Sequence, residues 1–312
     1  MRSTEERFLM DELSDYALYK GTEKHESDPE LRRIVARLKE TELRHAGVWA
    51  GFLGIKDLDS VRVPASLKLK VLAYSVVRRF LGIAFVTKLL ERHEREGLED
   101  YRTLVEGKGF SRATMAKISG IIKDEEEHEA TLLGQVQKHE TVLEYTRSIV
   151  FGMNDGLVEI LAVIAGVAMI ATTGFVVALT GIIVGVSGTL SMAAGAYLSS
   201  KSGKVVEKSL KDGQQARTSP GKEAYYTGLF YFVGAIVATY PFLLGSAGYL
   251  GILESVVSVS VVLTLASVLI AIMSDTRIKT RVVEMLAISL GTALATAAIG
   301  FVVRTVFGIA IS

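Results

Sequence analysis

The feature that most constrains this chain is a set of five long apolar runs in its second half. They cover residues 149–171, 175–199, 225–245, 249–273 and 283–308. Each run reaches the roughly 20 residues that a helix needs to cross a bilayer. Gly, Ala and Ser punctuate the runs, as in "GIIVGVSGTLSMAAGAYLSS", and let membrane helices approach closely. Because no run has an amphipathic polar face, we predict five membrane-spanning helices rather than a soluble apolar core.

Charge is unevenly distributed along the chain. Up to Arg147 the chain is dense in Lys, Arg, Asp and Glu, whereas charged residues are rare after Ser148. The net charge of +1 therefore describes neither the charged first part nor the apolar second part. We predict a soluble domain over 1–147 and a transmembrane domain over 148–312. The lack of a basic excess argues against a nucleic-acid partner, and the absence of cysteine excludes disulfides and thiolate metal sites.

The loops between the apolar runs predict the orientation in the membrane. The links "TTG" and "LGSAGYLG" are uncharged, whereas the other two loops are basic. Their basic residues are Lys201, Lys204, Lys208, Lys211, Arg217, Lys222, Arg277, Lys279 and Arg281. Because basic loops stay in the cytoplasm, we expect a cytoplasmic N-terminal domain and a C-terminus outside. Because the N-terminus has no signal-peptide core, we expect that the first domain is not exported. The expected location is a prokaryotic cell membrane.

The soluble domain is predicted to be helical throughout. "SDPEL" is a helix start, with Asp28 as the cap and Pro29 in the first turn. The segments "IKDLDSVRVP" and "EGKGFS" interrupt the helical pattern. The predicted helices are 4–26, 29–53, 65–106 and 111–145. The short link at 27–28 makes the first two antiparallel neighbours, so an all-α chain is expected, a four-helix bundle followed by five membrane helices.

Two helices of the bundle carry a Glu-x-x-His tetrad. Glu42 and His45 lie in "ETELRHAGVW", and Glu125 and His128 lie in "KDEEEHEATLL". Residues three apart share one face of a helix. Each tetrad therefore offers an oxygen and a nitrogen to one ion.

The other two helices supply carboxylates. The first holds Glu12, and the third holds Glu91 and Glu94, of which the spacing does not decide the bridging ligand. This arrangement is the ligand pattern of di-iron bundles, and carboxylate with imidazole suits iron or manganese. Taken alone, "DEEEHE" is more typical of a solvated face. Together the tetrads predict a two-metal site formed by Glu12, Glu42, His45, Glu91, Glu94, Glu125 and His128.

Asp155 and Glu159 interrupt the first apolar run, "IVFGMNDGLVEILAVIAGVAMIA". A carboxylate inside a bilayer costs on the order of 2.5 kcal/mol even on the mildest scale, so a functional role is expected. At about 1.5 Å per residue, Asp155 lies about 9 Å from the inner end of its span and Met192 about 10 Å from that of the second. The two can contact one ion, and Asn154 and Glu159 add oxygens.

These motifs carry two family resemblances. Glu12 seven residues before Tyr19, "ELRH", "E-x-x-E" and "E-x-x-H" resemble the rubrerythrin and ferritin-like di-iron family. "FGMNDGLVE" and "LSMAAGAYLSSKS" resemble the vacuolar iron transporter family of Fe²⁺/Mn²⁺ transporters. The combination is similar to the membrane-bound ferritins, or erythrin–vacuolar iron transporter proteins, over nearly the whole chain. It implies a ferritin-like bundle fused to a homodimeric exporter that exchanges metal for protons.

The second resemblance places the metal path along the first two spans. Asp155 and Met192 match in-membrane metal positions of the family. Two departures concern proton coupling: Val184 stands where plant members have an acidic residue, and Ala196 where many fused relatives have Glu. Glu159 is a candidate to share the proton. The short loop after the second span also lacks the Glu-rich domain of plant members, whose role the bundle is expected to take.

Three functions compete for these residues. In the first, the bundle captures cytosolic Fe²⁺ or Mn²⁺ and the spans export it. In the second, the chain is a membrane-anchored di-iron oxidase or peroxidase, with ferroxidase activity in the bundle. Five spans with internal carboxylates exceed what an anchor needs, and the absence of cysteine removes a rubredoxin-like electron relay. In the third, compatible with the first, the bundle senses metal and gates the pore.

Overall fold

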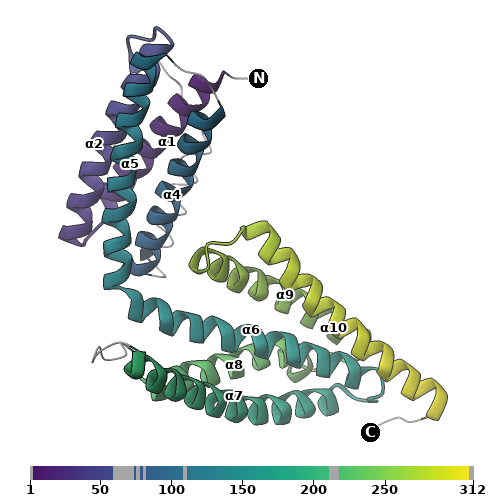
Figure 1. Cartoon of the computed structure of the whole chain (residues 1–312). Coiled ribbons are helices and arrows are strands. Elements are labelled where there is room, and N and C mark those ends of the chain that lie inside the picture. Colours follow the sequence, from purple (N-terminus) through teal and green to yellow (C-terminus); the bar gives the residue numbers. More distant parts are fainter. Residues whose placement is uncertain are drawn as a thin grey trace. The chain divides into compact units, whose positions relative to one another are not determined.

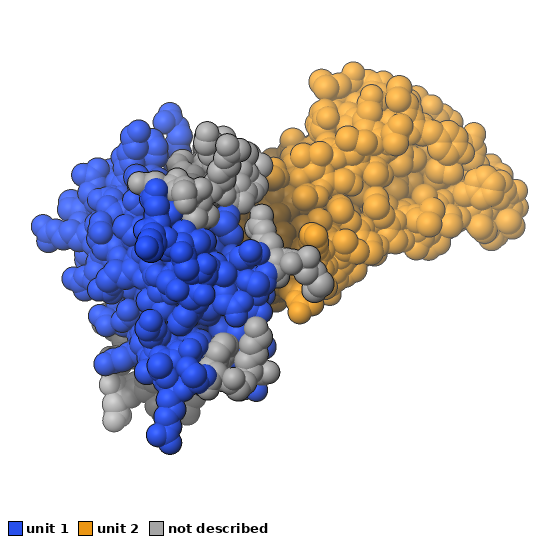
Figure 2. All heavy atoms as spheres, turned by 90° about the horizontal axis from the view of Figure 1, so that it is seen from above, with its two compact units in different colours: residues 1–140 blue, residues 141–312 orange. Residues whose placement is uncertain are grey.

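The computed structural model describes residues 3–58, 74, 78–79, 82–107, 111–210 and 218–308, with the backbone alone at 204–210. In these ranges the chain is helical and contains no strand, which confirms the all-α prediction (Figure 1). The helices are α1 (Thr4–His25), α2 (Pro29–Phe52), α4 (Ile83–Gly107), α5 (Arg112–Lys138), α6 (Glu140–Ala168), α7 (Gly174–Leu210), α8 (Pro220–Leu243), α9 (Gly248–Met273) and α10 (Ile278–Phe307). They form two compact units, residues 1–140 and 141–312, which Figure 2 shows in different colours.

Side-chain caps define three helix starts in the first unit. The Ser3 hydroxyl accepts the backbone N–H three residues on, in a reciprocal capping box with Glu6. Asp28 caps α2 in the same way and is followed by Pro29 at the first helical position, as predicted. Ser111 caps α5. Each cap satisfies a backbone donor that the first turn leaves without a partner.

Two predicted helix boundaries in this unit differ from the structure. The helix expected over 65–106 is interrupted at Gly82, which adopts a left-handed φ of 84°, and α4 begins at Ile83. Residues 74, 78 and 79 before this break are helical, and the rest of 65–81 lies outside the described part. The helix expected to end at 145 ends at Lys138, where His139 leaves the helical region at φ −104° and ψ 11°. The next helix begins at Glu140, nine residues before the predicted span at 149. No Gly or Pro marks this break.

The first unit has two apolar clusters, one toward each end of its helices. α1 packs along α2, α4 along α5, and α2 on α5. Phe8, Trp49 and Tyr101 belong to one cluster, and Leu38 and Leu90 to the other. On α2, α4 and α5 the predicted ligand residues come between the two clusters in sequence, whereas Glu12 of α1 lies next to Leu13 of the first cluster. The fold therefore buries a polar layer between two apolar ones.

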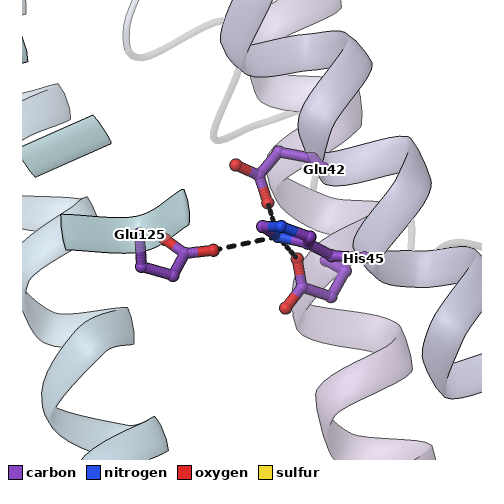
Figure 3. Close-up of side chains that lie close together, drawn as sticks. Glu42, His45 and Glu125 are labelled. Carbon is purple, nitrogen blue, oxygen red and sulfur yellow. Dashed lines mark ion pairs between the residues drawn. The ribbon is translucent and has the colours of Figure 1, made fainter. Parts of the chain in front are cut away.

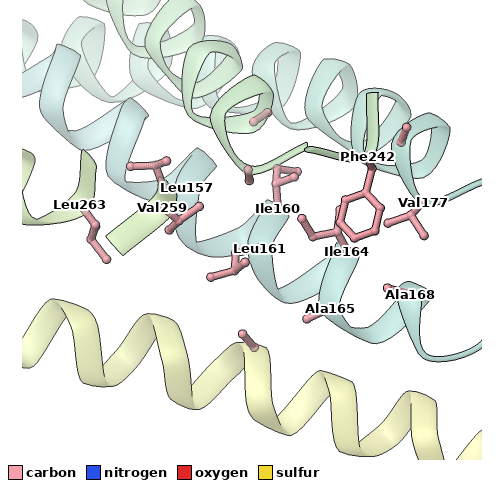
Figure 4. Packing of buried hydrophobic residues seen from close by; sticks show 14 residues of the cluster. Leu157, Ile160, Leu161, Ile164, Ala165, Ala168, Val177, Phe242, Val259 and Leu263 are labelled. Atoms are coloured by element: carbon pink, nitrogen blue, oxygen red, sulfur yellow. The ribbon is translucent and has the colours of Figure 1, made fainter. Parts of the chain in front are cut away.

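The second unit contains five helices, α6 to α10, that are long and apolar enough to cross a membrane, which confirms the five predicted spans. Figure 4 shows their shared apolar cluster, which includes Leu157 and Ile160 of α6 and in which Ile164 of α6 lies beside Phe242 of α8. α6 and α8 pack with their backbones in contact, because a Cβ on Gly156 would lie 2.2 Å from the carbonyl oxygen of Tyr231. Small residues at such positions permit close helix packing in membranes.

Candidate metal centre

Six ligand-type side chains occupy the polar layer of the first unit. All are between 2% and 6% exposed, a burial that charged groups tolerate only when they are paired or bound to metal. They are Glu12 of α1, Glu42 and His45 of α2, Glu94 of α4, and Glu125 and His128 of α5. The structure thus brings together all but one of the bundle residues predicted as ligands.

One group consists of Glu12, Glu42, His45 and Glu125, whose ligand atoms lie within 4.8 Å of one another. The Nδ1 atom of His45 lies 3.0 Å from Glu125, 3.5 Å from Glu12 and 3.7 Å from Glu42. Figure 3 shows Glu42 and Glu125 pointing toward the His45 imidazole from different sides. An ion among them would be bound by three different helices.

A second group consists of Glu42, Glu94, Glu125 and His128. The Nδ1 atom of His128 lies 3.2 Å from Glu42 and 3.5 Å from Glu94. The two imidazole ring centres are 6.1 Å apart. Glu42 and Glu125 belong to both groups, so two neighbouring ion positions would share two carboxylates.

The ligand atoms of these groups lie close together, but several of them form no hydrogen bond. Glu12 Oε2, Glu42 Oε1, His45 Nδ1 and His128 Nδ1 are buried and have no hydrogen-bond partner. Unsatisfied buried polar groups cost free energy and point to a binding or catalytic role. Carboxylate oxygens and imidazole nitrogens fit divalent first-row metal ions, so these residues are suited to hold two of them.

Electrostatics divides the charge unequally among the carboxylates. Burial and repulsion from Glu42 raise the pKa values of Glu12 and Glu125 well above the usual range. Burial opposes ionisation of Glu42 as well, but interactions with His128 and His45 outweigh it and lower its pKa to about 2. Burial lowers the pKa of His128, but Glu42 and Glu94 overcome this effect and raise it to about 9. At neutral pH a metal ion must displace the proton that His128 carries, so the affinity of the site for metal should rise with pH.

Two tyrosines support the carboxylates from the α1 and α4 side. The Tyr101 hydroxyl donates to Glu12 and itself accepts the indole N–H of Trp49 at 2.7 Å. The Tyr19 hydroxyl donates to Glu94. Hydrogen bonds of this kind orient ligand side chains. The sequence motif included Tyr19, but no sequence signal distinguished Tyr101 from an ordinary core tyrosine.

Asp124 is a further functional residue that sequence reasoning missed. Its Oδ2 atom lies 3.1 Å from Nε2 of His45. A carboxylate at this position favours the tautomer with a proton on Nε2, which leaves Nδ1 to face the other carboxylates. The only sequence signal is its place in the acidic run before Glu125, and solvated faces have such runs as well.

Glu91 differs from the other predicted ligands. It is 1% exposed, but its carboxylate lies 2.7 Å from the Lys88 ammonium and 2.9 Å from the Arg95 guanidinium. It belongs to neither group of ligand-type side chains, whereas Glu94 belongs to one. The geometry favours Glu94 for the ligand set and assigns Glu91 to an ion-pair network.

The predicted transport residues lie in the membrane unit. Asp155 and Asn154 of α6 and Met192 of α7 are half-buried. The Asn154 Oδ1 atom is buried and has no hydrogen-bond partner. Because α6 begins before the predicted span and α7 continues past residue 199, helix ends do not mark the membrane depth of Asp155 and Met192. Their shared depth therefore stays a prediction.

Glu159 has a partner that the sequence did not reveal. The Tyr231 hydroxyl of α8 donates to its Oε2 atom at 2.7 Å. Tyr231 packs against α7 where Gly188 leaves room: a Cβ there would lie 2.1 Å from the hydroxyl oxygen. Three membrane helices thus meet at this carboxylate.

Five apolar helices that carry internal carboxylates define the second unit as the body of an integral membrane protein. The family model described as the VIT family matches residues 146–217 and 204–301, and the chain belongs to that family of membrane metal transporters. The match lies within the membrane unit. No curated protein matches the chain.

Proposed function

We propose that this protein exports cytosolic Fe²⁺ or Mn²⁺, and that a ferritin-like, rubrerythrin-type bundle over residues 1–147 captures the metal for a transmembrane domain over 148–312. The observation that carries the proposal is the pair of overlapping, buried ligand groups in a chain of the VIT family. Neither unit alone suggests this combination. A bundle that concentrates metal gives a transporter its substrate at low cytosolic concentration.

In this proposal the bundle binds two ions. Glu12 and His45 hold one ion, Glu94 and His128 hold the other, and Glu42 and Glu125 bridge both. Support comes from the sharing of the latter two carboxylates between the groups. Oxygen-rich sites with one imidazole per ion suit Fe²⁺ and Mn²⁺ better than soft metals.

The transport path is proposed to run along α6 and α7 through Asp155, Met192 and Asn154. Protons moving inward would titrate Asp155 or Glu159 as metal moves outward. Carboxylates in membrane segments mark ion and proton pathways, because their cost must be offset by function. The hydrogen bond from Tyr231 to Glu159 supports a role for that carboxylate beyond packing.

The proposed assembly is a homodimer in a prokaryotic cell membrane. The bundle would lie in the cytoplasm and the C-terminus outside. The basic loops support this orientation by the positive-inside rule. The side chains of residues 204–217, which carry four of those basic residues, lie outside the described part.

Reconstitution in liposomes tests the proposal. Vesicles that contain a metal-sensitive dye and a proton gradient report Mn²⁺ flux through the protein. Asp155→Ala should abolish flux, while Glu42→Ala should reduce it and leave a remainder. Flux that is unchanged in both variants would contradict the proposed path and the proposed capture.

The alternative is a membrane-anchored ferroxidase or peroxidase. Two neighbouring metal positions with shared carboxylates also suit di-iron redox chemistry, which favours this candidate. The enzyme alternative predicts that Fe²⁺ oxidation depends on Glu42. It also predicts no metal flux in the wild type or in Glu42→Ala. Measuring oxygen consumption beside metal flux separates the two functions.

A further inference from the structure

A cavity of about 210 Å³ opens in the first unit on the side of α2 and α5. Polar and charged residues line much of it. They include Arg37, Thr41, Arg44, Asp124, Glu127 and His128. His128 also belongs to the second group of ligand-type side chains, so the cavity reaches that group directly.

The other sides of the polar layer are covered by closely packed residues. Tyr19 and Tyr101, with their hydroxyls on Glu94 and Glu12, are 0% and 3% exposed. Trp49 on one side and Leu132 on the other are 1% and 0% exposed and belong to the two apolar clusters. Close-packed interiors contain few gaps large enough for water. A hydrated ion that reaches the ligands needs a polar, open approach, and the cavity provides one.

One exposed side chain of the cavity lining connects α2 to α5. The Arg44 guanidinium of α2 lies 3.0 Å from the Thr41 hydroxyl and 3.5 Å from the Asp124 carboxylate of α5. The Arg44 and Asp124 side chains are 67% and 40% exposed. Exposed ion pairs of this kind contribute little stability, so the contact opens readily. Asp124 also contacts His45, which connects the opening to the first ligand group.

We infer that divalent cations enter and leave the ligand groups through this cavity, with the Arg44–Asp124 ion pair as the barrier at its opening. The inference rests on the proposed metal binding by the two groups. Asp124 and Glu127 are the first carboxylates that an incoming ion meets, whereas Arg37 and Arg44 repel it. Removing a positive charge from the opening should therefore accelerate binding, and filling the cavity should slow it.

Two variants, each with a matched control, test the route in the full-length protein in detergent. Arg44→Gln removes the charged barrier. Its control is Arg102→Gln in α4, which breaks another exposed ion pair, 3.0 Å long, with Glu126 of α5. Thr41→Leu fills the cavity, and its control is Thr22→Leu, a substitution of a threonine that is 8% exposed and does not line the cavity.

Stopped-flow mixing with Mn²⁺ and a dye for free Mn²⁺ gives the binding rate, and mixing the loaded protein with excess EDTA gives the release rate.

Arg44→Gln should raise the binding rate by about tenfold at low salt, within the range that local charge exerts on association. Thr41→Leu should slow binding and release by the same factor and leave the Kd unchanged, because an access route affects both directions equally. The controls should match the wild type. A Kd that changes in Thr41→Leu without matched rate changes would indicate a disturbed ligand instead and would overturn the inference.

The Glu42→Ala variant distinguishes a failure of the proposed route from a failure of the proposed metal binding. If wild type and Glu42→Ala bind the same amount of Mn²⁺ at equilibrium, the bundle does not bind metal and the proposed function fails. If they differ but neither cavity variant changes the rates, metal binding stands and the route is wrong.

Discussion

At the scale of single residues, Glu42 differs from Glu12 and Glu125, the other carboxylates of its first ligand group. It belongs to both ligand groups, and its pKa of about 2 keeps it ionised, whereas burial and repulsion from Glu42 raise the pKa values of Glu12 and Glu125. A carboxylate that stays charged in the interior attracts the first cation. Metal ions then compete with protons for the remaining carboxylates.

Glu42→Gln should remove most of the metal from the bundle, because the amide keeps the shape of the side chain and loses its charge. Elemental analysis of purified protein measures the metal bound per chain. Glu91→Gln is the matched control, since Glu91 is equally buried but pairs with Lys88 and Arg95. If Glu91→Gln loses as much metal as Glu42→Gln, Glu91 is a ligand after all.

At the scale of elements, an ion pair holds the end of α1. Glu26 follows that helix, and its side chain is 0% exposed, with the Arg78 guanidinium 2.7 Å from its carboxylate. Burial alone would raise the pKa of Glu26, but the hydrogen bonds from Arg78 reverse this effect and lower the pKa below 4.5. Because the folded pKa is the lower one, the pair stabilises the fold above about pH 4.5 and loses this effect as pH falls.

Arg78→Met should destabilise the bundle by about 3 kcal/mol at pH 7, because it leaves a buried carboxylate without a partner of opposite charge. The difference from wild type should shrink as pH falls below 4.5, where Glu26 takes up a proton. Urea unfolding monitored by the fluorescence of Trp49, the single tryptophan of the chain, reports this unit specifically. A difference that is constant between pH 7 and pH 4 would contradict the assignment to Glu26.

The contact between α6 and α8 gives a second prediction at this scale. Gly156→Ala places a methyl group 2.2 Å from the Tyr231 carbonyl oxygen, so the two helices must separate. We expect a loss of about 2 kcal/mol, typical of overpacking, and a lower Tm of the detergent-solubilised protein. Gly195→Ala in α7 is the control, because nothing lies within 4 Å of the added group. Equal Tm values for the two variants would show that the close contact tolerates a side chain.

At the scale of the whole molecule, the proposed function places metal capture and membrane passage in different units. The family match begins at residue 146, so the membrane unit contains the transporter sequence by itself. A chain that begins at Glu140 should still carry Mn²⁺ into liposomes, with a raised KM because the capturing site is gone. Flux measured against Mn²⁺ concentration gives KM and maximal rate separately. An unchanged KM would remove the capture role from the bundle.

Sequence patterns identified the helices well where a cap or an apolar run marked them. Asp28 and Pro29 indicated the start of α2, and long apolar composition indicated α6 to α10. The break at His139 escaped prediction because no Gly or Pro accompanies it. The spacing of Glu42, His45, Glu125 and His128 predicted residues that the structure does bring together, because a three-residue step determines one helical face.

The sequence by itself determined that the chain is helical and which segments are apolar enough to cross a membrane, because both depend on local periodicity and composition. Only the tertiary structure decided between Glu91 and Glu94, since it brings Glu94, and not Glu91, close to ligand-type side chains of other helices. Tertiary structure likewise placed Tyr101 on Glu12, Asp124 on His45 and Tyr231 on Glu159. Each of these contacts joins residues far apart in the chain, and no local pattern encodes which distant helix a polar side chain will meet.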